Sequence, residues 1–447
     1  MRTGEGKNEQ GVIITLVAMF MLFVVGAMAA LSIDVVTIYT ARSEAQLAAD
    51  SAALAAARVL ANSGATSDPN AATDGLMANA WTLAQAVALQ VAEQNQVGGV
   101  NLTSSQITIP TAPPSSVTNP TVNVKIQTNL PTFFARIWGR TQVTVAASAT
   151  AEAYNPSPTG VVTSGSFYPV APLCVKPWLL PNIDPTTGDT TIFSATTGAI
   201  TNPALLGWET LAPPGNTHLK TRCPAPPGNC LPATSNIPAA WQYYPGTTDP
   251  TTGSFPAPSA ASVTCTGCTG FNNYQLSIAG CVQKAISCYS SAPPSPAQII
   301  NIDTTSDANR DTETGAAVNG MTHASANGWA DSIDTAVASP PSGYEPFQFV
   351  AGLGNPIPGL AGNTVMVSDS LVTVPVIDTS TWPPATFPQV QIIGFVQLFL
   401  NPYGDPSTNG HIRTEVINLV GCGTAASGPP IVGNGASPVA VRLISPP

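Results

Sequence analysis

Charged side chains are scarce in this chain. Only 9% of its 447 residues are Asp, Glu, Lys or Arg, compared with roughly 25% in ordinary soluble domains. The 14 basic residues are outnumbered by 24 acidic ones, and the formal net charge is −10. A protein that binds nucleic acid needs a basic surface against the phosphates, so this composition excludes that class of partner. Apolar residues make up 44% of the chain, which also excludes disorder driven by high net charge.

Catalytic groups are equally scarce. The three histidines lie far apart in the sequence: His218, His323 and His411. The sequence contains no nucleophile elbow, zinc-protease helix, phosphate loop or dinucleotide fingerprint. Asp331 and Asp334 are spaced like paired carboxylates, but we expect them on the solvated face of a helix. The sequence therefore predicts a non-catalytic protein without a cofactor or a small-molecule substrate.

Two segments come close to metal-binding patterns and fail at the ligand positions. Asp378–Trp382 resembles the Asp-x-Ser-x-Ser metal site of von Willebrand A-type domains, but a Trp replaces the final Ser. Asp307–Asp311 spaces its oxygens like a calcium loop, yet Thr312 replaces the required Gly and Val318 the bidentate Glu. Short Asp, Ser and Thr segments of this kind are common turns. We predict no metal site.

One long apolar run stands out near the N-terminus. Val12–Ile33 contains 22 residues without a formal charge, and as a helix it would extend about 33 Å, enough to cross a bilayer core. Arg2 and Lys7 precede the run, and Arg42 is the nearest cation after it, which favours a cytoplasmic N-terminus. The alternative is a cleaved signal peptide, since Ala27–Ala29 offers a small-x-small site. The apolar pattern continues past that site, which favours a membrane anchor.

An alanine-rich helix is expected to follow the membrane segment. Ten of the 21 residues in 41–61 are Ala, the strongest helix former. Six of them recur at every fourth residue along one ridge: Ala41, Ala45, Ala49, Ala53, Ala57 and Ala61. A second ladder, Ala80, Ala84, Ala88 and Ala92, lies in the next predicted helix, Asp74–Gln96. Small side chains allow close helix approach, so the first ridge packs either on this second helix or on another subunit.

A small head is predicted after the helices. Thr121–Gln127 alternates apolar and polar residues with the period of a strand. Pro131 opens a predicted short helix, Thr132–Trp138, that ends at Gly139. The alternation resumes at Val143–Ala147. This unit is too small to bury much surface alone, so we expect it to pack against the alanine-rich helices.

Two motifs in this region resemble TadG-like Flp pilus-assembly proteins. The first, Leu31–Ala57, has an Asp at the end of a membrane helix, then a Tyr and an Arg, then a Gln-Leu-Ala-Ala-Asp run rich in Ala. The second is Phe133–Gly139 with the strand that follows it. The resemblance implies a pilin-like fold and a membrane-tethered accessory of the Flp/Tad pilus or secretion system. The family usually has basic residues where Glu9 and Gln10 precede Gly11 here.

The main pilin of such a system is a different protein. Pilins are processed after a Gly and carry a Glu at the fifth mature position. If Gly11 were that site, Leu16 would occupy the position, and no acidic residue lies within Val12–Ile33. Processing by a prepilin peptidase is therefore not expected.

The C-terminal two thirds are predicted to be β-rich. With 37 Gly and 44 Pro in the chain, short strands and ordered loops are favoured over long helices. Apolar runs bounded by turn residues mark the strands: Phe167–Val175, Phe347–Gly352, Val365–Ile377, Val390–Leu400, Ile412–Val420 and Val439–Ile444. We expect Val390–Leu400 to be a central strand paired with Ile412–Val420. The best helix candidate is Gly315–Val337.

All eight cysteines lie in this region: Cys174, Cys223, Cys230, Cys265, Cys268, Cys281, Cys288 and Cys422. The Cys265-x-x-Cys268 spacing is typical of a zinc site, but Cys281 and Cys288 are too far apart in sequence to be the second Cys pair of such a site. An even number in an exported domain favours disulfides. First candidate pairs are Cys223–Cys230, Cys281–Cys288 and Cys174–Cys422, although eight cysteines allow 105 connectivities.

The sequence thus predicts an α+β protein. We expect a cytoplasmic N-terminus at residues 1–11, a transmembrane helix at 12–33, a pilin-like helical stalk and head at 34–155, a linker at 156–166 and a β-rich exported domain with disulfides at 167–447. The expected function is that of a non-catalytic component of Flp/Tad pilus assembly or secretion in the bacterial inner membrane, with other subunits of that system as partners. The alternative is a surface adhesin on a pilin-like anchor, whose Pro- and Thr-rich loops bind an external ligand.

Overall fold

The structure of the protein is a computed structural model. It describes residues 6–156, 168–184, 190–195, 197–207, 244–245, 265, 267–286, 299–302, 309–334, 345–379, 389–407, 412–422, 430–433 and 437–444. Over these residues the chain combines one long helix, several shorter helices and five small to medium sheets. The mixed α+β class expected from the sequence is confirmed. The predicted linker falls almost wholly outside the described residues.

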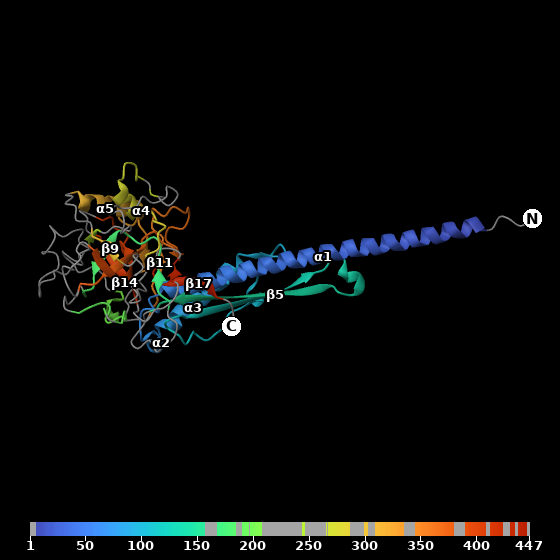
Figure 1. Ribbon diagram of the computed structural model, residues 1–447, viewed down its shortest axis with the longest axis horizontal. Helices are drawn as coiled ribbons and strands as arrows, with labels where there is room; N and C mark the ends of the chain where they lie inside the picture. The colour runs from blue at the N-terminus through green and yellow to red at the C-terminus, as the bar shows by residue number, and fades with distance from the viewer. Residues whose placement is uncertain are drawn as a thin grey trace, which may run out of the picture.

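A single helix, α1 (Gly6–Asn62), forms the axis of the molecule (Figure 1). Its 57 residues correspond to about 85 Å of helix. The helix is long and apolar enough to cross a membrane, and its most apolar stretch is not buried by the rest of the described chain. From Asp34 onward one face becomes buried, whereas Val12–Ile33 stays largely exposed. The apolar segment and the stalk are therefore one continuous helix.

Two further helices complete the stalk. After a turn at Ser63–Ser67 come α2 (Ala71–Asp74) and α3 (Leu76–Glu93), separated by Gly75 with φ +101°. The helix α3 packs along α1. The predicted helical hairpin is present, and α3 is slightly shorter at both ends than the sequence indicated.

A four-stranded antiparallel sheet covers another side of α1. The strand order is β17 (Ala440–Ile444), β5 (Gln142–Tyr154), β4 (Thr121–Pro131) and β3 (Ile107–Thr108). Every second residue of β4 points into the core, and Val122, Val124 and Ile126 are fully buried. The sheet packs on α1 through β4, β5 and β17, and the long β4–β5 hairpin runs beside the helix (Figure 1). A small hairpin, β1 (Gln96–Val97) and β2 (Val100–Asn101), and the 3-10 helix η1 (Ser104–Gln106) connect α3 to this sheet.

The last strand of this sheet comes from a different region than the sequence indicated. The run Val439–Ile444 was assigned to the exported domain, but β17 pairs with β5, with Ala440 opposite Tyr154 and Ile444 opposite Thr150. Arg442 joins Glu152 across the two strands. The end of the described chain therefore returns to the stalk and covers the edge of its sheet.

The C-terminal domain, which the sequence predicts to be exported and which is called the exported domain below, is built on a six-stranded sheet. Its order is β15 (Thr414–Gly421), β14 (Gln389–Leu400), β13 (Leu371–Ile377), β7 (Trp178–Pro181) and β8 (Tyr244–Pro245), and β9 (Ile299–Asn301) pairs with the start of β14. The predicted pairing of Val390–Leu400 with Ile412–Val420 is confirmed by β14 and β15. Both β13 and β15 are buried along their whole length, as expected for strands covered on two faces.

The two faces of this sheet have different partners. On one face, Val374 and Val396 share a core with Tyr274 of α4 (Asn273–Ala279) and Val318 of α5 (Arg310–Met321); these helices lie on the side of the domain away from the long rod (Figure 1). On the other face, residues such as Phe395 belong to the same core cluster as the alanines of α1. The core of the head thus extends onto one face of this sheet, while the other face has a core cluster of its own.

Smaller pieces fill the remaining periphery. They are the 3-10 helix η3 (Pro203–Leu205), the sheet of β10 (Ser332–Ile333), β11 (Phe349–Val350) and β12 (Thr364–Val365), and the parallel pair β6 (Val170–Ala171) and β16 (Ile431–Val432). The predicted helix Gly315–Val337 is corrected here, since α5 ends at Met321. His323 and Gly328 have φ values of +58° and +75°, which a helix does not accommodate.

Candidate functional site: the membrane-proximal stalk and its junction

The first acidic residue after the apolar run is buried by the tip of the β4–β5 hairpin. Asp34 is 3% exposed. One carboxylate oxygen accepts a hydrogen bond from the Phe133 N–H at 2.8 Å, and the other accepts from Phe134 at 3.0 Å and Ala135 at 2.7 Å. These N–H groups open the 3-10 helix η2 (Ala135–Trp138), where backbone donors lack partners within the helix. The carboxylate therefore caps η2 and fixes the tip to α1.

The electrostatics of this contact favour the ionised acid. Desolvation raises the pKa of the Asp34 carboxyl, but the three N–H groups and the positive charge of Arg136 lower it more, so the net pKa shift is downward. The two motifs that carried the family resemblance thus meet in space through Asp34. Sequence reasoning noted each motif but missed the contact, because 99 to 101 residues separate the partners.

The six alanines of the ridge are all fully buried (Ala41, Ala45, Ala49, Ala53, Ala57 and Ala61). So are the four alanines of the second ladder, Ala80, Ala84, Ala88 and Ala92. Both sets belong to one core cluster, and α1 packs against α3, β4, β5 and β17. The ridge therefore has partners within its own chain, both α3 and the sheet of the head, which the sequence predicted to pack against the alanine-rich helices.

Polar side chains fix how α1 sits in this packing. The Gln46 amide of the alanine-rich motif donates to Asp50 Oδ1 at 2.7 Å and to the Ser148 carbonyl of β5 at 3.2 Å. On the α3 side, Glu44 accepts a hydrogen bond from the Gly98 N–H at 2.7 Å. The Gln and Asp of the motif thus have a structural explanation, since Gln46 joins the helix to the sheet and Asp50 accepts a second hydrogen bond from the same amide.

We expect Ala49→Leu to lower the free energy of unfolding by about 1–3 kcal/mol, because it adds carbon atoms where the core has no free space. Urea denaturation of the full-length protein in detergent would measure the loss. Ser43→Leu is the matched control: it places the same side chain on the exposed face of the same helix and should change stability by no more than about 0.5 kcal/mol. Wild-type stability of Ala49→Leu would contradict the packing described here.

A buried polar network joins the end of α1 to the exported domain. Asn418 of β15 is fully buried and donates to the Ala61 carbonyl and to Gln397 Oε1, each at 2.6 Å. Asn155, at the end of β5, donates to the carbonyls of Thr66 and Leu419, each at 3.0 Å. The Ser67 hydroxyl lies within hydrogen-bond distance of Asn418 Oδ1 and the Leu419 carbonyl, and it accepts a hydrogen bond from the Asn155 amide. Such a network fixes the direction of the exported domain relative to α1.

The disulfides differ from the predicted pairs. Cys174 is bonded to Cys281 and Cys265 to Cys268, so the predicted Cys174–Cys422 and Cys281–Cys288 pairs are wrong. Cys422 is also disulfide-bonded. None of the described cysteines is a free thiol; Cys223, Cys230 and Cys288 lie outside the described residues. Cys281, which the sequence analysis paired with its near neighbour Cys288, is bonded to a residue 107 positions away, and local spacing does not reveal such a partner. The predicted Cys223–Cys230 pair lies outside the described residues.

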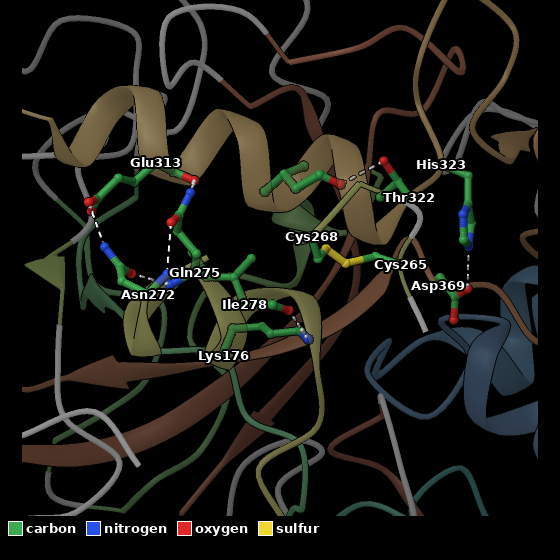
Figure 2. The surroundings of a disulfide bond; sticks show 11 residues. Lys176, Cys265, Cys268, Asn272, Gln275, Ile278, Glu313, Thr322, His323 and Asp369 are labelled. Atoms are coloured by element: carbon green, nitrogen blue, oxygen red, sulfur yellow. Dashed lines mark hydrogen bonds and ion pairs between the residues drawn. A yellow bond between two sulfur atoms is a disulfide. The ribbon is translucent and has the colours of Figure 1, made fainter. Parts of the chain in front are cut away.

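A buried lysine lies close to this part of the domain. The Lys176 ammonium donates to the carbonyls of Ile278 at 2.5 Å and Gly280 at 3.0 Å, at the end of α4 (Figure 2). Desolvation lowers the pKa of Lys176 to about 8, although the charge of Asp369 raises it in part. Figure 2 also shows the Cys265–Cys268 disulfide packed beneath α5 and the His323–Asp369 pair nearby.

The lowered pKa predicts a pH dependence. Between pH 8 and 10.5 the unfolded chain keeps a proton on Lys176 that the folded chain has lost, so stability should rise with pH across this window, by up to about 3 kcal/mol. Urea denaturation at several pH values would measure the slope. Lys176→Met should flatten it relative to the wild type, and equal slopes in the two proteins would contradict the assigned pKa.

The candidate carboxylate pair is corrected by the structure. Asp331 lies outside any helix and is buried, where it accepts hydrogen bonds from the Gly352 N–H at 2.9 Å, Asn355 Nδ2 at 3.1 Å and the Ser368 hydroxyl at 2.6 Å. It holds three loop segments together instead of facing solvent beside Asp334.

The other sequence candidates for chemistry are only partly visible. In the calcium-like segment Asp307–Asp311, residues 307 and 308 lie outside the described residues, whereas Asn309 is the N-cap of α5 and Arg310 begins that helix. Residues 380–382 of the Asp378–Trp382 segment, and His218 and His411, lie outside the described residues. Within the described part of the chain, no three His, Cys, Asp or Glu side chains gather in a way that could hold a metal ion.

Comparison with known proteins gives one match. Residues 11–59 match the family model described as "Putative Flp pilus-assembly TadE/G-like". Searches of the curated proteins and of the solved structures found no match. The matched range covers the exposed apolar half of α1, Asp34 and most of the alanine ridge. The N-terminal segment of this chain is therefore similar to that of TadE/G-like Flp pilus-assembly proteins, as the Leu31–Ala57 motif indicated.

Proposed function

We propose that this protein is a membrane-anchored, non-catalytic component of Flp/Tad pilus assembly. The observation that carries the proposal is the family match at residues 11–59 on a helix whose apolar half is exposed and whose second half is the core of a folded stalk. An exposed helix surface of this length and composition is stable in lipid and unfavourable in water.

In this proposal α1 crosses the inner membrane with its N-terminus in the cytoplasm. The stalk and the exported domain then lie on the periplasmic or outer side, where disulfides such as Cys174–Cys281 persist. From Asp34 to Asn62 the helix continues for about 42 Å, which sets the distance of the exported domain from the membrane. The shared core and the Asn418 network would hold that domain rigidly, as a fixed docking platform for other pilus-assembly or secretion subunits.

Two measurements test the proposal. Mass spectrometry of the N-terminus of the membrane-bound protein should find the apolar segment retained; a mature chain starting at Ala30 in the soluble fraction would contradict the anchor. Affinity purification from native membranes should recover a secretion ATPase or Flp-type pilins. A retained anchor without such components would contradict the pilus role and favour the adhesin.

A further inference from the structure

The tip of the β4–β5 hairpin lies at the level where α1 leaves the apolar run. Asp34, which caps the tip, follows directly after Val12–Ile33. The hairpin runs beside α1 toward the N-terminus and ends partway along the helix (Figure 1). If α1 spans the membrane, as the proposed function requires, this contact places the tip at the boundary between hydrocarbon and water.

The outer surface of the tip is apolar and uncovered. Phe133, Ile137 and Trp138 are 63%, 75% and 56% exposed. On α1 next to Asp34, Val36 and Tyr39 are also exposed, at 63% and 70%. Large apolar side chains gathered on a surface indicate a contact with lipid or with a partner. Trp and Tyr are the residues that favour the membrane–water boundary, because their rings are apolar and one edge is polar.

The charges of the tip fit a lipid surface. Between Pro131 and Gln142 the sequence contains two cations, Arg136 and Arg140, and no acidic residue. Arg136 is held in place by a hydrogen bond from its Nε to the Thr132 carbonyl at 2.7 Å. The carboxylate that contacts the tip, that of Asp34, is enclosed by backbone N–H groups. Cations beside exposed aromatic rings complement the phosphates of anionic lipids.

We propose that the β4–β5 tip is a second membrane contact, in which Phe133, Ile137 and Trp138 insert among the lipid headgroups of the leaflet that α1 leaves on the exported side. Lipid is favoured over a protein partner because the tip is fixed at the depth of the bilayer surface and presents both cations and aromatic rings there. Together with α1, this contact would give the stalk two points of attachment and so restrict its tilt and rotation relative to the membrane.

Tryptophan fluorescence can test this inference in the full-length protein. No Trp lies within Val12–Ile33, so the transmembrane segment itself contributes no signal. The protein would be placed in nanodiscs of phosphatidylethanolamine and phosphatidylglycerol with bromine atoms near the top of the acyl chains. We expect these lipids to quench the wild-type fluorescence, and Trp138→Phe to lose most of that lipid-dependent quenching.

Trp329→Phe is the matched control, because Trp329 is also exposed, at 41%, but lies in the exported domain. This variant should keep the quenching of the wild type. Equal quenching by brominated lipid in the wild type and in Trp138→Phe would overturn the inference. So would Trp138 fluorescence that aqueous iodide quenches, because Trp138 would then face water. Trp138 fluorescence that a second protein molecule protects from both iodide and brominated lipid would also overturn it. If the protein gives one of these results while it remains in the nanodiscs, the tip contact is wrong but the α1 anchor still holds. Loss of the protein from the nanodiscs would contradict both the anchor and the tip contact.

Discussion

Replacing Asn418 by Ala should lower the free energy of unfolding by roughly 3–5 kcal/mol, because it leaves several buried polar groups unpaired. The Asn418 side chain is fully buried, and its amide donates to the Ala61 carbonyl and to Gln397 Oε1. Its own oxygen accepts a hydrogen bond from the Ser67 hydroxyl at 3.1 Å. These partners come from α1, β14 and the turn after α1, so the substitution also weakens the connection between stalk and exported domain.

Urea denaturation of the full-length protein, followed by near-ultraviolet circular dichroism, would measure this loss. Asn129→Ala is the matched control, since Asn129 is exposed and its side-chain oxygen accepts a hydrogen bond from the Thr144 hydroxyl. This control substitution should lower the free energy of unfolding by no more than about 0.5 kcal/mol. We further expect the Asn418 variant to unfold in a broader or two-step transition. A single transition at the wild-type midpoint would show that the network contributes little.

The Cys174–Cys281 disulfide should contribute much more stability than Cys265–Cys268. The first joins residues 107 apart in sequence and the second residues 3 apart. Because a disulfide restricts the unfolded chain in proportion to the logarithm of the loop it closes, the expected contributions are about 5 and about 2 kcal/mol. Converting Cys174 and Cys281 to Ser should therefore lower stability by more than twice as much as converting Cys265 and Cys268.

The two double variants act as controls for each other, since each removes one disulfide and adds two hydroxyls. Denaturation under oxidising conditions would compare them, and non-reducing peptide mapping would verify that the remaining disulfides are unchanged. The opposite order, with a larger loss of unfolding free energy in the Cys265 and Cys268 variant, would contradict this prediction. It would mean that local packing around that bond, such as its contact with Gly320, outweighs the loop-closure effect.

Local patterns in the sequence were sufficient for the elements themselves. The uncharged run and the alanine spacing predicted one helix from the membrane segment through residue 61, and α1 extends to Asn62. Alternation predicted β4 and β5, and an apolar run on both faces predicted the central strand β14 and its partner β15. The Leu31–Ala57 motif indicated the family segment that the match at residues 11–59 supports. Each of these signals arises from residues within one or two elements, where periodicity and turn chemistry act directly.

Contacts between distant segments could not be obtained in this way. Asp34 reaches the tip across 99 residues, Asn418 reaches Ala61 across 357, and β17 returns to β5 from the far end of the chain. The helix predicted to extend to Val337 is α5, which ends at Met321, and Asp331 is a buried hydrogen-bond acceptor. Both differences arise because loops from other segments pack there. Cys281 likewise bonds Cys174 and not its near neighbour. The sequence by itself determined where the apolar helix, the alanine-rich helix and the main strands lie; the tertiary structure alone decided which of them meet, because burial and hydrogen-bond satisfaction depend on partners that no local spacing encodes.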